Sequence, residues 1–551
     1  MRRLLPALIA LISLGACGEH KDAPRSPSSL AAADIDKPSP LDKSFRLKDG
    51  EALDVDRLFK LFPLYIRPTY DAVSFDRKLG ATVVTNLRFG AAEDEGFTAK
   101  RAEFYGVDLD RLERIEAAAG AAPPEAPMGL VVRKLRLFGI ESVGGAKTTV
   151  GAVEIDSLRV REGGIPKDPP GSGIAAFFNA FDVAGVYFRD VKAAAAEKDE
   201  ADLKVGVDFS AQDIRIVGLG GGRLQAFLAR DMDYLISQSP DAIAAATRGA
   251  GPMADVLLNG PLRHFIAPEN QRMRIKSLEW RDISFAGLMP FALKGERPPV
   301  DARNLIDLGT ARIVDAETLI GAKRFSIVPT TEISAMEFSW LAPSKVRAVT
   351  RGGLYDFTAY VADDEKEAIA ALQSRKLNAV KGDSDLAYDW NPERGAAVLS
   401  TGFDSAGFAD FDLDVALEGL ELAKIEAARA AGESRPALDL ARLKSFSLTI
   451  VDEQLLDAFY ALSAIETGET EREIRAATPA LLRVAKVGLE RESPRVAGYI
   501  EAVADFLEDG GALEIRAAPE SPVPLAAIAA AAQGGPDAMA QAVNLTVARK
   551  E

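Results

Sequence analysis

The sequence predicts an α+β protein made mostly of antiparallel β-sheets with long amphipathic strands, and with helices concentrated at the C-terminus. Three observations predict this class. Apolar and polar residues alternate through residues 82–89 and 408–417, which is typical of strands with one buried face. A unit of Gly or Asp followed by alternating apolar residues recurs at irregular spacing, as in a meander. Apolar stripes at helical spacing gather after residue 450.

Residues 1–16 have the order of a secretory signal, in which a charged start and an apolar run precede small residues. The apolar run from Leu4 to Leu14 would span roughly 16 Å as a helix, whereas a bilayer core needs about 20 residues. We therefore expect a cleaved signal peptide rather than a spanning anchor.

The signal ends on Leu14-Gly15-Ala16-Cys17, and Cys17 is the only cysteine of the chain. These four residues resemble the lipobox of bacterial lipoproteins. The resemblance implies lipidation of Cys17, with acyl chains that hold the protein at a membrane. Several acyl chains anchor a protein stably where a single one is marginal. Gly18 follows the cysteine where an Asp would retain a lipoprotein in the inner membrane, so the resemblance implies the outer membrane, facing the periplasm.

Residues 17–44 are rich in Pro, Ser, Ala and charge and have no apolar period, so they predict a flexible tether behind the lipidated cysteine. A chain of 551 residues exceeds the size at which single cores stop growing. We expect an N-terminal β-rich α+β domain over residues 45–345. A C-terminal α+β domain with a helical end is expected over residues 346–551.

The N-terminal domain opens with a short helical pattern over residues 55–62, which stops at Pro63. The recurring units that follow predict the strands of the meander. These units begin at Gly106, Gly139, Gly185, Asp213, Asp282 and Gly419.

Two parts of the chain also resemble each other. Residues 74–76 match residues 387–389, and residues 106–120 match residues 419–432, at nearly constant offset. Both parts read as three strands followed by a helix rich in Ala and Glu. One interpretation is two related halves that arose by duplication. The other is that amphipathic hairpins in Ala-rich chains look alike by chance.

The end of the chain carries most of the predicted helices. Apolar stripes predict helices over residues 455–462 and 496–507. The second begins after Ser493-Pro494 and ends at Asp509-Gly510, which are typical start and stop signals. A strand over residues 513–516, helices from about Pro524 and Pro536, and a strand around residues 545–547 complete the prediction.

Composition excludes several classes of partner. The formal net charge is −16, or −18 once Arg2 and Arg3 leave with the signal. Such an acidic protein does not suit nucleic acid, whose phosphates demand clustered Lys and Arg. Once Cys17 is acylated no thiol remains for a disulfide, so the packed core must hold the fold.

No motif predicts a catalytic residue, a cofactor site or a metal site. His264 is the only histidine beyond His20, and its surroundings indicate a structural role. Residues 218–223 lack the last glycine of a dinucleotide fingerprint and predict a flexible strand-to-helix connection. Residues 142–148 lack both glycines of a phosphate-binding loop and predict a hairpin turn.

Acidic residues cluster at two places that could attract a divalent cation. Asp383 and Asp385 are one such place, and Asp410, Asp412 and Asp414 are the other. Neither continues into a calcium-binding loop. Alternate acids on a strand are typical of its solvated face, and we expect no metal there.

The Gly-apolar-x-apolar units on strands are similar to the β-rich periplasmic parts of AsmA-like envelope proteins. The resemblance implies a sheet whose concave apolar face shelters lipid acyl chains or packs against a protein partner. Aromatic residues on the predicted strands favour such a face. They are Phe177, Phe178, Phe181, Tyr187, Phe188, Trp280, Phe285, Phe338 and Trp340.

Three functions follow as hypotheses. The first is a non-enzymatic structural or adaptor lipoprotein that supports assembly of the outer membrane or envelope and has a protein partner there. The second is a protein that binds or transfers lipids or other apolar ligands. The third is a hydrolase of glycans or peptidoglycan, which would use paired carboxylates with no fixed spacing in the sequence.

Overall fold

The computed structural model describes residues 34–62, 67–92, 95–118, 126–144, 147–164, 172–198, 204–238, 270–361, 363–491 and 493–550. Contacts divide the chain into two compact units, Pro27–Ala322 and Lys323–Glu551, here the N-terminal and C-terminal units. The boundary predicted from the sequence lies between residues 345 and 346. That position falls inside a hairpin in which Ser339 pairs with Ala342, and the structure keeps the whole hairpin in the C-terminal unit.

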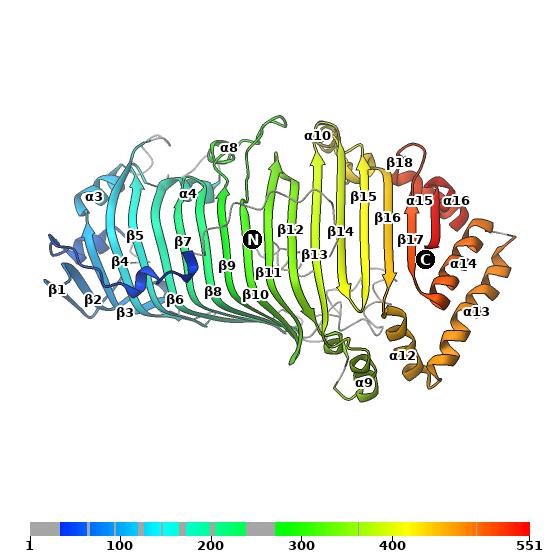
Figure 1. Ribbon diagram of the computed structural model, residues 1–551. Helices are drawn as coiled ribbons and strands as arrows, with labels where there is room; N and C mark the ends of the chain where they lie inside the picture. Colours follow the sequence, from blue (N-terminus) through cyan, green and yellow to red (C-terminus); the bar gives the residue numbers. More distant parts are fainter. Residues whose placement is uncertain are drawn as a thin grey trace. The chain divides into compact units, whose positions relative to one another are not determined.

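The strands of the N-terminal unit form a large antiparallel meander (Figure 1). Each strand pairs with the next along the chain, from β1 with β2 to β9 with β10. The strands are β1 (Ala72–Asp76), β2 (Ala81–Ala92), β3 (Glu95–Val107), β4 (Met128–Val143), β5 (Lys147–Arg161), β6 (Phe181–Lys198), β7 (Lys204–Gly220), β8 (Arg223–Gln238), β9 (Asn270–Ser284) and β10 (Thr310–Ile320).

Helices in the described part of this unit are short and few. They are α2 (Val55–Lys60), α3 (Leu109–Ala117), α4 (Gly173–Ala180) and α8 (Met289–Lys294), with 3₁₀ turns η1 (Asp34–Asp36) and η2 (Pro40–Asp42). Side chains of Asp54 and Asp108 accept hydrogen bonds from the first turns of α2 and α3 and so fix where these helices begin. The predicted helix over residues 55–62 is confirmed as α2.

Two rows of residues with left-handed backbone conformation cross the meander. One row holds Asn86, Gly139, Asp190, Asp231 and Asp315, and the other holds Gly106, Ser157, Gly218 and Asp282. Leu137 and Ile140 show what such a residue does, because they lie three apart yet pack in the same core cluster. Residues three apart in a regular strand face opposite sides. The extra residue, Gly139, acts as a bulge that returns apolar side chains to one face.

These bulges explain part of the recurring unit in the sequence. Gly106, Gly139 and Asp282, which begin three of the units, have φ angles of 56°, 59° and 61°. Gly, Asp and Asn tolerate this conformation better than other residues, which accounts for their recurrence. Gly185 and Asp213 begin units but do not have positive φ.

Residues 34–47, here called the strap, lie across the strands of the N-terminal unit (Figure 1). Arg215 on β7 donates to the backbone carbonyls of Ile35, at 3.1 Å, and Lys37, at 2.8 Å. Further along the strap, Phe45 stacks edge-on against Tyr105 of β3 with ring centroids 5.0 Å apart. The flexible tether predicted over residues 17–44 includes residues 34–44, which the structure instead places against the sheet. Cys17 and the rest of the tether lie outside the described residues.

The C-terminal unit continues the antiparallel pattern. Its strands are β11 (Lys323–Ser339), β12 (Ala342–Tyr355), β13 (Val380–Asn391), β14 (Ala396–Ala406), β15 (Ala409–Glu418), β16 (Arg442–Asp452), β17 (Ala512–Ala517), β18 (Val523–Pro524) and β19 (Leu545–Lys550). Strands β11 to β17 pair in chain order, β16 also pairs with β18, and β17 with β19.

Most of the described helices belong to the C-terminal unit, so the coarse prediction of an α+β protein with helices toward the C-terminus is confirmed. They are η4 (Phe357–Tyr360), α9 (Lys366–Ser374), α10 (Leu422–Ala430), α11 (Pro436–Leu440), α12 (Leu455–Thr467), α13 (Glu471–Leu489), α14 (Pro494–Asp509), α15 (Leu525–Gln533) and α16 (Pro536–Ala542). Helices α12 and α14 pack on the sheet through Tyr460 and Phe506, against Ile450 and Leu513.

Helix α13 turns its charged side inward and an apolar side outward. Arg483 forms ion pairs of 3.0, 2.7 and 2.6 Å with Glu501, Asp505 and Glu508 of α14. On the other side, Leu481, Val484 and Val487 are 68%, 70% and 68% exposed. This helix was not predicted from the sequence, and Pro479 inside it would normally indicate a helix end.

Candidate functional site

The most extensive uniform surface of the N-terminal unit consists of two apolar rows across strands β3 to β10, here called the apolar face. Register places the members of each row side by side on neighbouring strands. The first row is Phe104, Leu135, Ile155, Val186, Ile216, Phe227, Trp280 and Ala311. The second row is Ala102, Leu137, Val153, Phe188, Ile214, Ala229, Leu278 and Ile313.

Part of the apolar face forms the core of the unit. Helix α2 places Leu58 and Phe59 on it, and Leu109 of α3 joins the same cluster. This cluster reaches Val186 and Phe188 on β6. The two rows continue beyond it, across β7 to β10.

Beyond β6 the apolar face is partly buried: Ala229, Ala311 and Ile313 are 0%, 6% and 3% exposed, whereas five larger side chains are half-buried. Ile214, Ile216, Phe227, Leu278 and Trp280 all have intermediate exposure. Neighbouring strands lie about 4.8 Å apart, so side chains opposite one another shield each other's flanks and leave their ends accessible. Eight strands at this spacing make an apolar band about 34 Å wide. A band of this width can contact a ligand along its whole length.

Between the two apolar rows, on the opposite face, runs a row of mostly charged residues, here called the ionic row. It consists of Glu103, Arg136, Glu154, Tyr187, Arg215, Leu228, Glu279 and Arg312. Glu154 is fully buried and pairs with Lys134 and with Arg136, the latter at 2.6 Å. Other charges of the row pair along their own strands, Glu103 with Arg101, Arg215 with Asp213 and Glu279 with Arg281.

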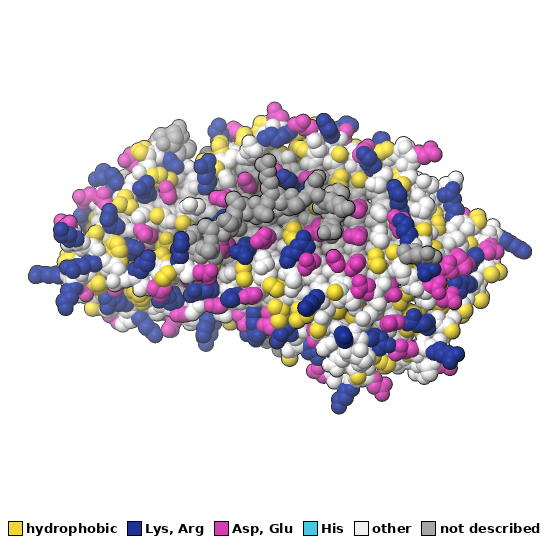
Figure 2. All heavy atoms as spheres, in the orientation of Figure 1, with side chains coloured by type: hydrophobic (Ala, Val, Ile, Leu, Met, Phe, Trp, Pro, Cys, Tyr) yellow, Lys and Arg dark blue, Asp and Glu magenta, His cyan; other side chains and the backbone are white. Residues whose placement is uncertain are grey.

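The strap contacts the part of the ionic row from Arg136 to Leu228 and supplies further partners to it. Arg136 donates to the carbonyls of Pro40, at 3.4 Å, and Lys43, at 2.8 Å. The Ile35 side chain is fully buried and packs against Ala226 and Leu228. Backbone carbonyls of the strap therefore accept hydrogen bonds from arginine N–H groups that would otherwise be buried without an acceptor. Around the strap, basic and acidic side chains lie interspersed on the surface (Figure 2).

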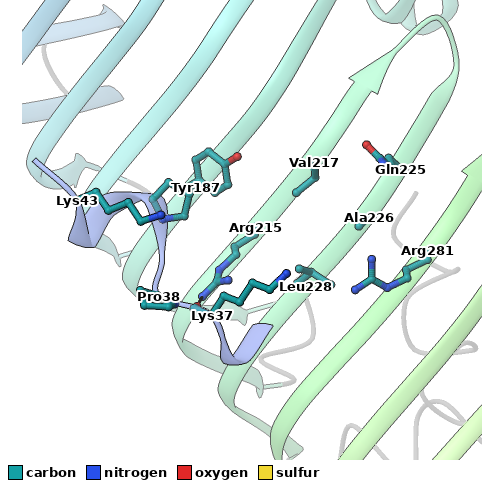
Figure 3. A pocket seen from close by; sticks show the side chains of 11 residues that line it. Lys37, Pro38, Lys43, Tyr187, Arg215, Val217, Gln225, Ala226, Leu228 and Arg281 are labelled. Carbon is teal, nitrogen blue, oxygen red and sulfur yellow. Dashed lines mark hydrogen bonds between the residues drawn. The ribbon is translucent and has the colours of Figure 1, made fainter. Parts of the chain in front are cut away.

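A cavity of about 270 Å³ lies between the strap and the sheet (Figure 3). Its polar lining comprises Lys37, Lys43, Tyr187, Arg215, Gln225 and Arg281, and none of the described residues that line it is acidic. Burial is the largest cause that raises the pKa of Tyr187, and the nearby carboxylates of Asp156 and Glu154 raise it further. The Tyr187 hydroxyl therefore stays protonated.

The residues that sequence analysis considered for chemistry do not converge. Asp383 accepts from the backbone of Gly352 at 2.7 Å, and Asp410 accepts from that of Ser405 at 2.8 Å. Asp414 accepts from the hydroxyl of Ser400 at 2.6 Å. Among the described residues no group of three His, Cys, Asp or Glu has the arrangement of a metal site. His264 lies outside those residues.

Two motif predictions have different outcomes. Residues 142–148 join β4 and β5, whose Glu141 and Thr149 pair, as the predicted hairpin turn requires. The prediction for residues 218–223 is wrong, because they form the turn between β7 and β8 and not a strand-to-helix connection. Gly221 and Gly222 with positive φ make this a tight strand-to-strand turn.

Aromatic residues of the predicted strands separate onto different elements. Phe188 and Trp280 lie on the apolar face, while Tyr187 lies on the ionic row. Phe177 and Phe178 belong to α4 instead of a strand. Sequence reasoning missed the ionic row and the basic cavity, since their members come from separate strands and alternate with apolar neighbours.

One comparison with known proteins finds a match in the C-terminal unit. Residues 402–550 match the model of a family described as "Uncharacterized protein". No curated protein matches the chain. Among the described helices, none combines the length and apolar character needed to cross a bilayer.

Proposed function

We propose that this protein is a lipoprotein of the cell envelope that binds lipid acyl chains along its apolar face. The observation that carries the proposal is the unbroken apolar character of both rows from β3 to β10. Strands that are amphipathic along their length, with bulges that keep apolar side chains on one side, would produce such a face. An apolar surface of this extent is normally covered by a ligand or a partner.

Chemistry favours acyl chains over a protein on this face. Protein interfaces carry hydrogen bonds and a polar rim around their apolar centre. The two rows contain no charged side chain, and Trp280 directs its indole N–H to the carbonyl of Leu308 at 2.5 Å. Acyl chains need no hydrogen-bond partner, so they suit a surface that offers none.

The proposal is tested by native mass spectrometry of the full chain extracted in mild detergent. We expect the wild-type protein to carry co-purifying lipid. Ile214→Asp, which places a charge on the apolar face, should lose it. Val398→Asp is the matched control, because Val398 is a 47% exposed strand residue of the C-terminal unit. A lipid-free wild-type mass, or equal lipid in both variants, would contradict acyl-chain binding.

Membrane attachment through Cys17 is part of the proposal and is tested separately. Wild-type protein should incorporate a palmitate analogue and sediment with membranes. Cys17→Ser should do neither, because the chain would lack its acyl groups. Equal labelling of both proteins would overturn the lipoprotein proposal while leaving acyl-chain binding open to its own test.

A second function, that of an adaptor for an envelope assembly, is favoured by one observation on the C-terminal unit. Helix α13 exposes Leu481, Val484 and Val487 at a spacing that puts them on one side. An amphipathic helix of a partner could cover this side. A photoreactive residue at position 484 should then form a defined protein crosslink in envelopes, and one at Val398 should not.

We also infer that the two halves arose by duplication. Strands β1 to β3 followed by α3 correspond to β13 to β15 followed by α10, and an offset of 313 residues carries the bounds of α3 onto those of α10. Gly106 and Gly419 precede these helices with φ angles of 56° and 81°. Relatives that contain one copy of this unit would support duplication. The two segments can be superposed in a crystal structure of this protein. A mismatch in the order of their strands would contradict duplication.

A further inference from the structure

The cavity under the strap has the features of an anion site, and it is independent of the apolar face. It lies on the side of the sheet that carries the ionic row, since Arg215 belongs to both. Lys37 and Lys43 come from the strap, whereas Arg215 and Arg281 come from β7 and β9. Four positive side chains thus meet around one cavity in a protein whose net charge is −16.

The two arginines are held in place by groups outside the cavity lining. Arg215 pairs with Asp213 at 2.6 Å, and Arg281 pairs with Glu279 at 3.2 Å. Asp213 and Glu279 are both buried, at 2% and 4% exposure. Because these pairs are buried, they fix the guanidinium groups before any ligand arrives. A preorganised donor loses little entropy on binding.

Lys43 supplies positive charge beyond these internal pairs. Lys43 is exposed and forms no ion pair among the described residues. Lys37 extends from the strap toward the strand that carries Leu228, and Arg281 reaches toward the same space (Figure 3). Lysine binds phosphate as a point charge, while arginine offers a planar pair of donors. The cavity holds both kinds of donor.

Neutral groups complete the site. Tyr187 and Gln225 can donate hydrogen bonds, and Val217, Ala226 and Leu228 provide an apolar floor. The volume of about 270 Å³ is smaller than most drug-sized pockets. A small ligand with a charged end and a short apolar part fits this combination.

We propose that this cavity binds a small anion that carries a phosphate group. Binding would link the strap to β7 and β9 through the ligand, in addition to the carbonyl contacts that Arg215 already makes. The phosphate could come from a free metabolite or from a lipid headgroup at the membrane surface, and both sources present the same oxygen acceptors.

The test measures binding of the full chain to inorganic phosphate and glycerol phosphate by calorimetry, and to vesicles of phosphatidylglycerol in phosphatidylcholine by sedimentation. The double variant Lys37→Glu, Lys43→Glu should bind at least tenfold more weakly, since two charge-assisted contacts are lost. Lys48→Glu is the matched control, because Lys48 is an exposed lysine that directly follows the strap and lies outside the cavity lining. Its binding should equal that of the wild type.

Binding of the soluble phosphates supports the site with a free ligand, and charge-dependent binding of vesicles alone supports it with a headgroup. No binding of any probe by the wild-type protein would overturn the proposal. An equal loss in the Lys48→Glu control would also overturn it, because that result indicates nonspecific attraction. Ile214→Asp should leave phosphate binding unchanged, which separates this site from the proposed acyl-chain face.

Discussion

Glu154 is the residue on which the ionic row depends most. Its side chain is fully buried, and it is the shared partner of Lys134 and Arg136. Removing it would leave the buried Arg136 without a carboxylate and Lys134 with only Asp156, at 3.4 Å. A buried ion pair adds little net stability, but breaking one by deleting a single partner is costly.

We therefore predict that Glu154→Ala lowers the free energy of unfolding by about 3–5 kcal/mol. Urea denaturation followed by circular dichroism measures this loss. Glu141→Ala is the control, because its ion pair with Lys100 is 3.4 Å long and more than half exposed, and such pairs contribute about 0–1 kcal/mol. Equal effects of the two substitutions would mean that the strap does not seal the ionic row.

Asp233 on β8 gives a pH dependence with a defined sign. Hydrogen bonds from Arg272, at 2.6 and 2.5 Å, hold the pKa of this carboxyl below its usual value near 4, against the opposing effect of burial. The folded protein thus binds a proton at Asp233 less readily than the unfolded chain. The stability from this pair is complete above the unfolded pKa and is lost as pH falls through the lowered one.

For Asp233→Asn, we expect the protein to be less stable than the wild type at pH 7 and to approach it below about pH 4. Unfolding in urea at a series of pH values measures this difference. A difference that stays constant from pH 7 to pH 3 would show that Arg272 does not perturb Asp233.

At the scale of elements, the exposed side of helix α13 can be compared with the buried side of helix α14. Val484 is 70% exposed, whereas Phe506 of α14 is 5% exposed within the core of the C-terminal unit. Val484→Gln should change the free energy of unfolding by less than about 0.5 kcal/mol, and Phe506→Ala should cost about 3–5 kcal/mol. Thermal unfolding of the purified variants compares them. Strong destabilisation by Val484→Gln would indicate that the outer side of α13 is packed in the isolated protein.

Local patterns in the sequence were sufficient to predict elements whose apolar side is buried. The helices over residues 455–462 and 496–507 appear as α12 and α14, and the strand over residues 82–89 appears within β2. Helix α13 was missed because its exposed side is apolar and its charges face α14, which reverses the usual pattern.

The strap shows a second limit of sequence reasoning. Its position depends on backbone carbonyl groups that accept hydrogen bonds from Arg136 and Arg215, which lie far along the chain. Every residue has a backbone carbonyl, so the residue types of the strap do not reveal these contacts. Composition alone therefore indicated a tether. The basic cavity was missed for the same reason, since strap and strands each contribute only part of it.

At the scale of the whole molecule, the N-terminal unit reverses the usual arrangement of a sheet. Part of its charged side lies under a strap, and its apolar side continues beyond the core that α2 and α3 form. Charges buried in pairs cost desolvation, and an apolar face that extends past its core requires a cover. Both features are consistent with a sheet that presents its apolar side to a ligand.

The most direct test of acyl-chain binding places a photoreactive residue at Ile216 on the apolar face and, separately, at Val398 in the C-terminal unit. After irradiation of intact membranes, mass spectrometry of the purified protein detects covalent lipid adducts. Acyl-chain binding predicts adducts at position 216 and none at position 398. Protein crosslinks without lipid at position 216, or lipid at both positions alike, would contradict it.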